Sequence, residues 1–263
     1  MNNYFRLVFF FFFMVNFLGG QNLESPKIFP FKEGESLKYK MSYSNFLNAG
    51  FSSIDVKEIL HEGKEAFHVL GKGKSTGLVR IFFKLKNDYQ TFMYKHNLKP
   101  FRFIRKINEG GYTKNKEILF NHDEEEATVK NYKNKTTKKY SITKNAQDML
   151  SALYFLRNQD LEKFTPGQEL SIHMFYDQEI NDFKLRFLGK EVINTKFGKI
   201  NSLKFRPLVQ TGRVFKEQES LTIWISDDEN KIPLRIKASL TVGSLRADLN
   251  QFRGLVAPLV TLD

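Results

Sequence analysis

The chain has 263 residues, no cysteine and a formal net charge of +12. Without cysteine it can form neither a disulfide nor a lipid-modified N-terminal cysteine, and a cysteine nucleophile is excluded. The basic excess favours anionic partners such as anionic lipid or anionic glycan. Nucleic acid is disfavoured by the exported location for which the N-terminus argues.

Residues 1–20 have the features of a secretory signal peptide. Arg6 precedes an apolar run at residues 7–18, and Gly19 and Gly20 supply small residues for cleavage. The run has about a dozen residues, whereas a membrane-spanning helix needs ~20, and Asn16 interrupts it. A short membrane anchor is the alternative. We expect export to the periplasm and one mainly-β domain at residues 21–263, with no transmembrane segment in the mature chain.

Apolar and polar residues alternate along most of the remaining chain, which predicts half-buried strands. The first alternation places four residues on one face: Leu37, Tyr39, Met41 and Tyr43. Further strands are predicted near residues 79–85, 101–105, 170–174, 183–187 and 203–205. Turns are expected at Gly63, Asn87-Asp88, Asn97, Gly110-Gly111 and residues 121–124. The basic stretch at residues 130–139 is expected to be an exposed hairpin tip.

One segment has helical periodicity instead. Between residues 145 and 158, apolar residues recur at helical spacing: Ala146, Met149, Leu150, Leu153 and Leu156. Asn145 is the expected N-cap, while Asp148 complements the helix start and Arg157 complements its end. Tyr154 and Phe155 widen the apolar surface, so the helix is expected to lie against or inside the sheet.

The C-terminal part predicts an antiparallel meander. Apolar runs at residues 221–225 and 232–236 flank an acidic turn, and a third run broken at Gly243 follows. Short strands without interleaved helices predict a mainly β fold, either a curved antiparallel sheet or a partly open β-barrel, with one central amphipathic helix. Two tandem half-sheets are the alternative, although no internal repeat is visible.

Four stretches carry a family resemblance: residues 48–51 (Asn-Ala-Gly-Phe), the glycine-rich residues 71–77, the helical residues 147–157, and residues 224–249. Through them the chain resembles an uncharacterised bacterial family, domain of unknown function 3108, over residues 30–255. The resemblance implies an exported protein of Gram-negative bacteria, particularly the Bacteroidota. It carries over no activity, cofactor or catalytic residue. The outline is similar to curved-sheet envelope proteins that shield a hydrophobic ligand under a helix, which is a fold-level analogy.

Catalytic motifs are incomplete in this sequence. Gly73-Lys74-Ser75 matches the end of a phosphate-binding loop, but His68 occupies the leading glycine position, and residues 78–85 are predicted as a strand. Gly-x-Ser-x-Gly is absent, and Gly243-Ser244 lacks the flanking residues of a nucleophile elbow. Acidic residues are too numerous to nominate a glycosidase pair. We therefore expect no enzyme activity.

Metal-binding motifs are not found either. The histidines show no spacing that places two imidazoles on one metal: His61, His68, His96, His122 and His173. Carboxylates gather at residues 227–229 but lack the alternate spacing and central glycine of a calcium loop. The sequence predicts a solvated hairpin turn there, and neither a metal site nor a cofactor.

Aromatic residues are abundant, with 27 phenylalanines and 10 tyrosines. They either fill a wide curved sheet or line a concave pocket for an apolar molecule. If they line a pocket, the expected lining residues are Tyr39, Tyr43, Phe83, Phe103, Phe155, Phe187 and Trp224. An anionic head-group is then expected to pair at the rim with Arg213, Arg235 and Arg246.

These observations favour a non-enzymatic periplasmic or envelope protein that binds or carries an apolar or amphiphilic molecule such as a lipid. One alternative is a structural or interaction module that docks on another envelope protein through a strand edge or a basic face. The other is a hydrolase that acts on envelope glycans or lipids.

Overall fold

The computed structural model describes residues 28–44, 47–82, 84–176, 178–208, 221–240 and 243–262, without the side chains of Leu78 and Phe82. The predicted signal peptide lies outside the described residues. Within them, fourteen strands form one sheet. The strands are β1 (Ser36–Tyr43), β2 (Leu47–His61), β3 (Lys64–Ser75), β4 (Leu85–Tyr94), β5 (Pro100–Glu109), β6 (Tyr112–Asn121), β7 (Glu126–Asn131), β8 (Thr136–Ser141), β9 (Glu169–Tyr176), β10 (Glu179–Thr195), β11 (Gly198–Leu208), β12 (Leu221–Ser226), β13 (Pro233–Ser239) and β14 (Ser244–Arg253).

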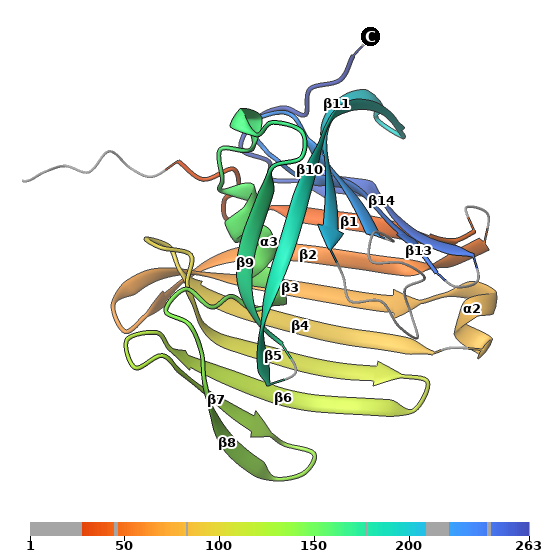
Figure 1. Cartoon of the computed structure of the whole chain (residues 1–263). Coiled ribbons are helices and arrows are strands. Elements are labelled where there is room, and N and C mark those ends of the chain that lie inside the picture. Colours follow the sequence, from red (N-terminus) through yellow and green to blue (C-terminus); the bar gives the residue numbers. More distant parts are fainter. Residues whose placement is uncertain are drawn as a thin grey trace, which may run out of the picture.

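The sheet consists of two antiparallel meanders, which are joined by the pairing of β1 with β14. Its strand order is β8-β7-β6-β5-β4-β3-β2-β1-β14-β13-β12-β11-β10-β9, so β1 pairs with β14 and unites the two ends of the chain. The edge strands β8 and β9 are not paired with each other, and the sheet is therefore curved but open. The prediction of a curved antiparallel sheet is confirmed (Figure 1).

The main helix is shorter than predicted. The helix α3 (Met149–Arg157) begins after Asp148, whose carboxylate accepts hydrogen bonds from the backbone N–H groups of Leu150 and Ser151. The predicted N-cap at Asn145 is wrong, because the preceding segment pairs with β9 instead. The Gln147 N–H donates to His173 O, and the Phe175 N–H donates to Gln147 O, both at 2.8 Å.

Two local predictions in the N-terminal half are also wrong. Residues 79–85 were predicted as a strand, but the chain forms a short helix, α2 (Gly77–Phe82). Gly77 adopts a φ of 57°, which ends β3 in a conformation that favours glycine. The turn predicted at Asn87-Asp88 lies inside β4, where pairing with both β3 and β5 satisfies the backbone and outweighs local turn propensity.

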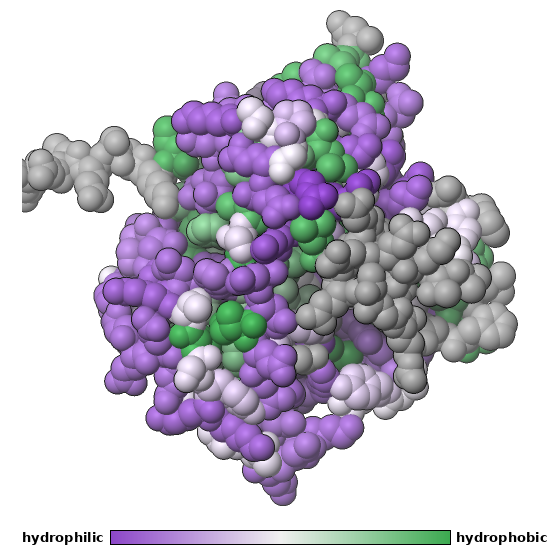
Figure 2. Space-filling model, in the orientation of Figure 1, coloured by the Kyte–Doolittle hydropathy of each residue, from purple (hydrophilic) through white to green (hydrophobic). Residues whose placement is uncertain are grey.

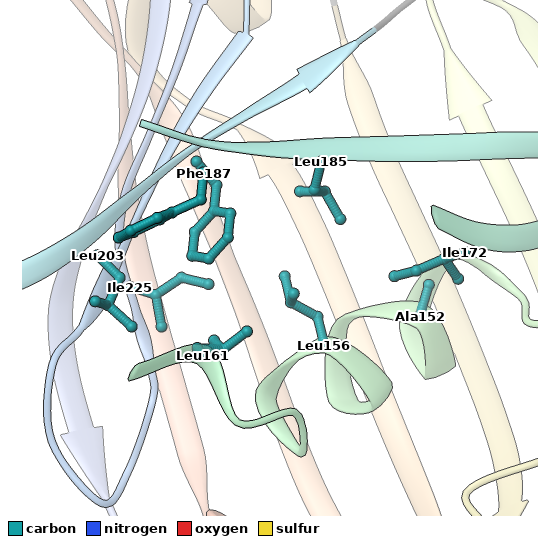
Figure 3. Packing of buried hydrophobic residues seen from close by; sticks show 9 residues of the cluster. Ala152, Leu156, Leu161, Ile172, Leu185, Phe187, Leu203 and Ile225 are labelled. Carbon is teal, nitrogen blue, oxygen red and sulfur yellow. The ribbon is translucent and has the colours of Figure 1, made fainter. Parts of the chain in front are cut away.

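The core lies between α3 and the concave side of the sheet. Ala152 and Leu156 point from α3 toward Ile172 and Leu185 of the C-terminal strands (Figure 3). On the other side of the helix, the Tyr154 ring packs edge-on against Phe31, with centroids 4.6 Å apart. After α3, the 3-10 helix η1 (Leu161–Lys163) leads to β9. The helix therefore fills the space between the two halves of the sheet.

Candidate functional site

The two faces of the sheet differ in chemistry. On β4, Thr91 and Met93 are buried on the side of α3, and Thr91 Oγ1 donates to Asp148 Oδ2 at 2.5 Å. We call this side the inner face. The alternate residues of the same strand, including Asp88 and Phe92, are partly exposed on the opposite, outer face. The charged residues of β4 that are open to solvent therefore lie on the outer face.

A groove of about 840 Å³ crosses the outer face of β1–β5. Directly paired residues of antiparallel strands share a face, so the strand register aligns their side chains in rows. One row contains Lys38, Ser53, Lys72, Asp88 and Lys106. The neighbouring row contains Phe51, Lys74, Lys86 and Asn108. Asn250 and Gln251 of β14 line the groove beside β1.

The groove is strongly basic. Five lysines line it, and we call them the groove lysines: Lys38, Lys72, Lys74, Lys86 and Lys106. The aspartate among the lining residues, Asp88, already accepts a hydrogen bond from Gln90 Nε2 at 2.8 Å. Among the described residues, no carboxylate forms an ion pair with a groove lysine. With five lysines and one aspartate in its lining, the groove has an excess of positive charge that favours an anion.

A second basic hollow, of about 410 Å³, adjoins the groove at Asn250. Four basic side chains line it: Lys40, Lys196, Arg235 and Arg246. The carboxylate of Asp248 lies 2.6 Å from the Nε atom of each arginine. Arg235 Nη2 also donates to Asn194 O at 3.0 Å, and Lys196 Nζ donates to Asn250 Oδ1 at 3.2 Å. The end of the β10–β11 hairpin thus forms one wall of this hollow.

The aromatic residues predicted to line a pocket belong to three packing clusters. Phe155 and Phe187 pack in the cluster between α3 and the C-terminal strands, while Phe103 packs with Phe175 in another. Tyr39 belongs to a third cluster, and its hydroxyl donates to Pro233 O at 3.0 Å. Burial raises the pKa of Tyr39 above its usual range. These residues fill space around the helix.

Among the other predicted lining residues, Trp224 packs in the same cluster as Tyr39 and is 9% exposed. Its Nε1 donates to Glu191 Oε2 at 3.1 Å. Tyr43 is half-buried at the end of β1, and Phe83 lies outside the described residues. The predicted rim arginines Arg235 and Arg246 lie in the second hollow of the outer face, and Arg213 lies outside the described residues.

Sequence reasoning missed a buried ion pair in the core. The guanidinium of Arg157 and the carboxylate of Glu35 are both 0% exposed, and Nη1–Oε1 and Nη2–Oε2 are each 2.7 Å. Arg157 Nη2 also donates to Pro30 O and Asn230 O, at 2.8 and 2.9 Å. The sequence predicts that Arg157 complements the helix end, and in the structure its guanidinium also connects α3 to the N-terminal segment and to the β12–β13 turn. A charged residue on the apolar side of the predicted helix was the available signal.

No metal site is visible in the described part of the chain, where no three His, Asp or Glu side chains cluster suitably. His173 Nδ1 lies 2.7 Å from Asp182 Oδ1 on an exposed surface, which is a typical surface pair. The Gly73-Lys74-Ser75 sequence belongs to β3, and the helix that follows it has six residues. In this structure Lys74 is one of the groove lysines.

The basic stretch at residues 130–139 forms the β7–β8 hairpin, as predicted. The edge strand β8 is almost entirely exposed and has Lys138 and Lys139 side by side. Lysine on a short edge strand discourages pairing with a further strand. In the view of Figure 2, hydrophilic residues dominate and hydrophobic residues form small separate areas. Among the described helices, none has the length and hydropathy required to span a membrane.

Comparison with one solved structure supports the fold. A β-barrel-like protein of the family DUF1849 from Brucella abortus matches with a TM-score of 0.56 and 10% identity, covering 84% of this chain and 98% of that one. A protein with a YmcC-like fold from Bacteroides fragilis matches with a TM-score of 0.33 and 11% identity, covering 86% and 98% of the two chains. No curated protein matches the sequence. Residues 38–250 match the family described as protein of unknown function, DUF3108, and the chain therefore belongs to that family.

Proposed function

We propose that this protein is a non-enzymatic, exported component of the cell envelope that binds an anionic ligand in the groove of the outer face. The observation that carries the proposal is the row of groove lysines, which meet on neighbouring strands without a carboxylate partner among the described residues. Unpaired like charges at this spacing repel one another, and a bound carboxylate, sulfate or phosphate group relieves that repulsion.

The packing of the interior supports a ligand site on the outer face. The sequence analysis favours an apolar or amphiphilic ligand, which is sheltered under the helix if the aromatic residues line a pocket. However, α3 and its neighbours occupy that space with side chains such as Tyr154 and Leu156, which are 0% and 3% exposed. Phe103 borders a hollow of about 10 Å³, which is at the lower limit for one water molecule. Under this proposal, an amphiphilic ligand binds to the outer face through its anionic group.

Export follows from the predicted signal peptide. The proposal expects the mature chain to begin at Gln21, in the periplasm. N-terminal sequencing of the protein recovered from a periplasmic extract tests this point, and an intact N-terminus in the membrane fraction would favour the alternative of a short anchor.

The binding proposal is tested with a short sulfated dextran as the probe and neutral dextran as the control ligand. We expect the triple variant Lys72→Gln/Lys86→Gln/Lys106→Gln to weaken binding about tenfold, because each exposed ion contact contributes a few tenths to one kcal/mol. The matched control, Lys144→Gln/Lys184→Gln/Lys199→Gln, removes the same charge from exposed positions outside the groove and leaves binding nearly unchanged. Equal losses in both variants would show non-specific attraction and contradict the proposal.

A further inference from the structure

The groove and the second basic hollow of the outer face adjoin each other. The groove and the second hollow share Asn250, and β1 contributes Lys38 to the first and Lys40 to the second. Lys38 and Lys40 lie two residues apart on the same face of this strand. The basic surface between these two lysines therefore stays on one face of the sheet. Together the hollows form one channel, which we call the basic channel.

The basic channel is long. It runs across the strands from β5 through β4, β3, β2, β1 and β14 to β13. At about 4.8 Å between neighbouring strands, the six steps correspond to roughly 29 Å. A single phosphate, sulfate or carboxylate group occupies only a small part of that length. A ligand that uses the whole channel has several negative charges distributed along an extended chain.

The channel has positive charge at both ends. The groove lysines surround the aspartate Asp88, and the second hollow has four basic side chains around Asp248. Arg235 Nε donates to Asp248 Oδ1 at 2.6 Å, and Arg246 forms an ion pair with the same carboxylate. Lys40 forms no ion pair with a described carboxylate, and its charge is available for a ligand.

The neutral lining of the channel indicates what kind of polyanion fits. Amide side chains stand between the lysines and arginines: Asn48, Asn108, Asn194, Asn250 and Gln251. Amides donate to and accept from hydroxyl groups, which polysaccharides present along their length. Single-stranded nucleic acid requires successive aromatic platforms, whereas Phe51 is the aromatic side chain among the described residues that line the two hollows. A flat lipid surface would contact protruding side chains rather than recessed ones.

We infer that the basic channel binds an extended anionic polysaccharide that spans both hollows. This inference rests on the proposed function and deepens it by naming the ligand class. The acidic groups of successive sugars pair with the groove lysines and then with Lys40, Arg235 and Arg246, while the hydroxyl groups contact the amides. Because one chain engages both hollows, binding is expected to strengthen with chain length until the channel is filled.

The test compares a uronic acid disaccharide with a decasaccharide of the same sugar, by calorimetric titration of the mature protein. We expect the decasaccharide to bind at least about tenfold more tightly per site than the disaccharide. The variant Lys40→Gln/Lys196→Gln changes the second hollow without removing a partner of Asp248. It is expected to weaken decasaccharide binding several-fold and to leave disaccharide binding unchanged.

The controls separate this inference from the proposed function. The groove variant Lys72→Gln/Lys86→Gln is expected to weaken the binding of both probes. The control variant Lys144→Gln/Lys199→Gln, at exposed positions outside both hollows, is expected to weaken neither. If length has no effect, or if the second-hollow variant binds the decasaccharide like the wild type, the inference fails while groove binding stands. If neither probe binds, the inference fails, and the sulfated dextran titration then decides whether the proposed function stands. Tighter binding of anionic lipid vesicles or of a single-stranded oligonucleotide would also overturn the polysaccharide assignment.

Discussion

At the scale of single residues, the buried carboxyl of Asp148 makes the folded state sensitive to pH. Its side chain is 0% exposed, and burial raises its pKa from 3.8 to about 6, although Thr91 Oγ1 and two backbone N–H groups donate to it. The folded protein thus holds this proton more tightly than the unfolded chain does. The contribution of Asp148 to stability is fully present below about pH 4 and is lost as the pH rises through about 6.

The variant Asp148→Asn tests the predicted loss of stability with rising pH. An asparagine still accepts the N-cap hydrogen bonds but does not titrate. Between pH 4 and pH 7, we expect the free energy of unfolding of the wild type to fall relative to the variant by up to about 3 kcal/mol, at 1.36 kcal/mol for each pKa unit. Urea unfolding of both proteins at several pH values measures this difference. A difference that stays constant with pH would contradict the prediction.

The Arg157–Glu35 pair yields a second prediction at this scale. Replacing Arg157 with Met leaves the carboxylate of Glu35 buried without its cation, and we expect a loss of about 3–5 kcal/mol of unfolding free energy. The double variant Glu35→Gln/Arg157→Met removes both charges and should recover a large part of that loss. A double variant as unstable as the two single variants added together would show that the pair acts through packing alone.

At the scale of elements, α3 stabilises the fold through the side that faces the C-terminal strands. Leu156 is buried against Leu185 and Phe187, so Leu156→Ala is expected to cost about 2–5 kcal/mol because it leaves a cavity. Met149 stands on the same helix but is 39% exposed, and Met149→Ala should change stability by less than about 0.5 kcal/mol. Urea unfolding of both variants measures the contrast. Equal effects would indicate that α3 does not pack as described.

The sequence patterns predict elements well where alternation is long and uniform. The β1 alternation and the β12–β13 hairpin are examples, since one buried face fixes the side on which each residue lies. They fail where tertiary partners override local preference. Gln147 pairs with β9 instead of extending α3, and Asn87 lies within a strand that is paired on both sides. Such pairings connect residues distant in the chain, and composition does not reveal them.

At the scale of the whole molecule, the same limit applies to the candidate site. Alternation predicts that Lys38 is solvated, and this is confirmed. It does not predict that Lys38, Lys72 and Lys106 share one row, because that depends on the register of four successive strand pairs. The second hollow depends in addition on the pairing of β1 with β14, which joins the two ends of the chain.

That central pairing leads to a prediction about cooperativity. β1 and β14 pair along their length, and α3 packs on both halves of the sheet, so we expect the protein to unfold as one unit. The chain has one tryptophan, Trp224, whose fluorescence reports on the C-terminal half. Circular dichroism reports on all strands. The urea transitions measured by the two signals should coincide in the wild type.

A variant in the N-terminal half makes the test decisive. Phe67 of β3 is 1% exposed and packs against Phe29 and Phe31, remote in sequence from Trp224. Phe67→Ala is expected to cost about 3–5 kcal/mol and to lower the midpoint of both transitions equally. If the two half-sheets were independent, the fluorescence transition would keep its wild-type midpoint while the dichroism curve split into two steps. A common shift of both curves would instead establish that the β1–β14 pairing and α3 make the two halves one cooperative structure.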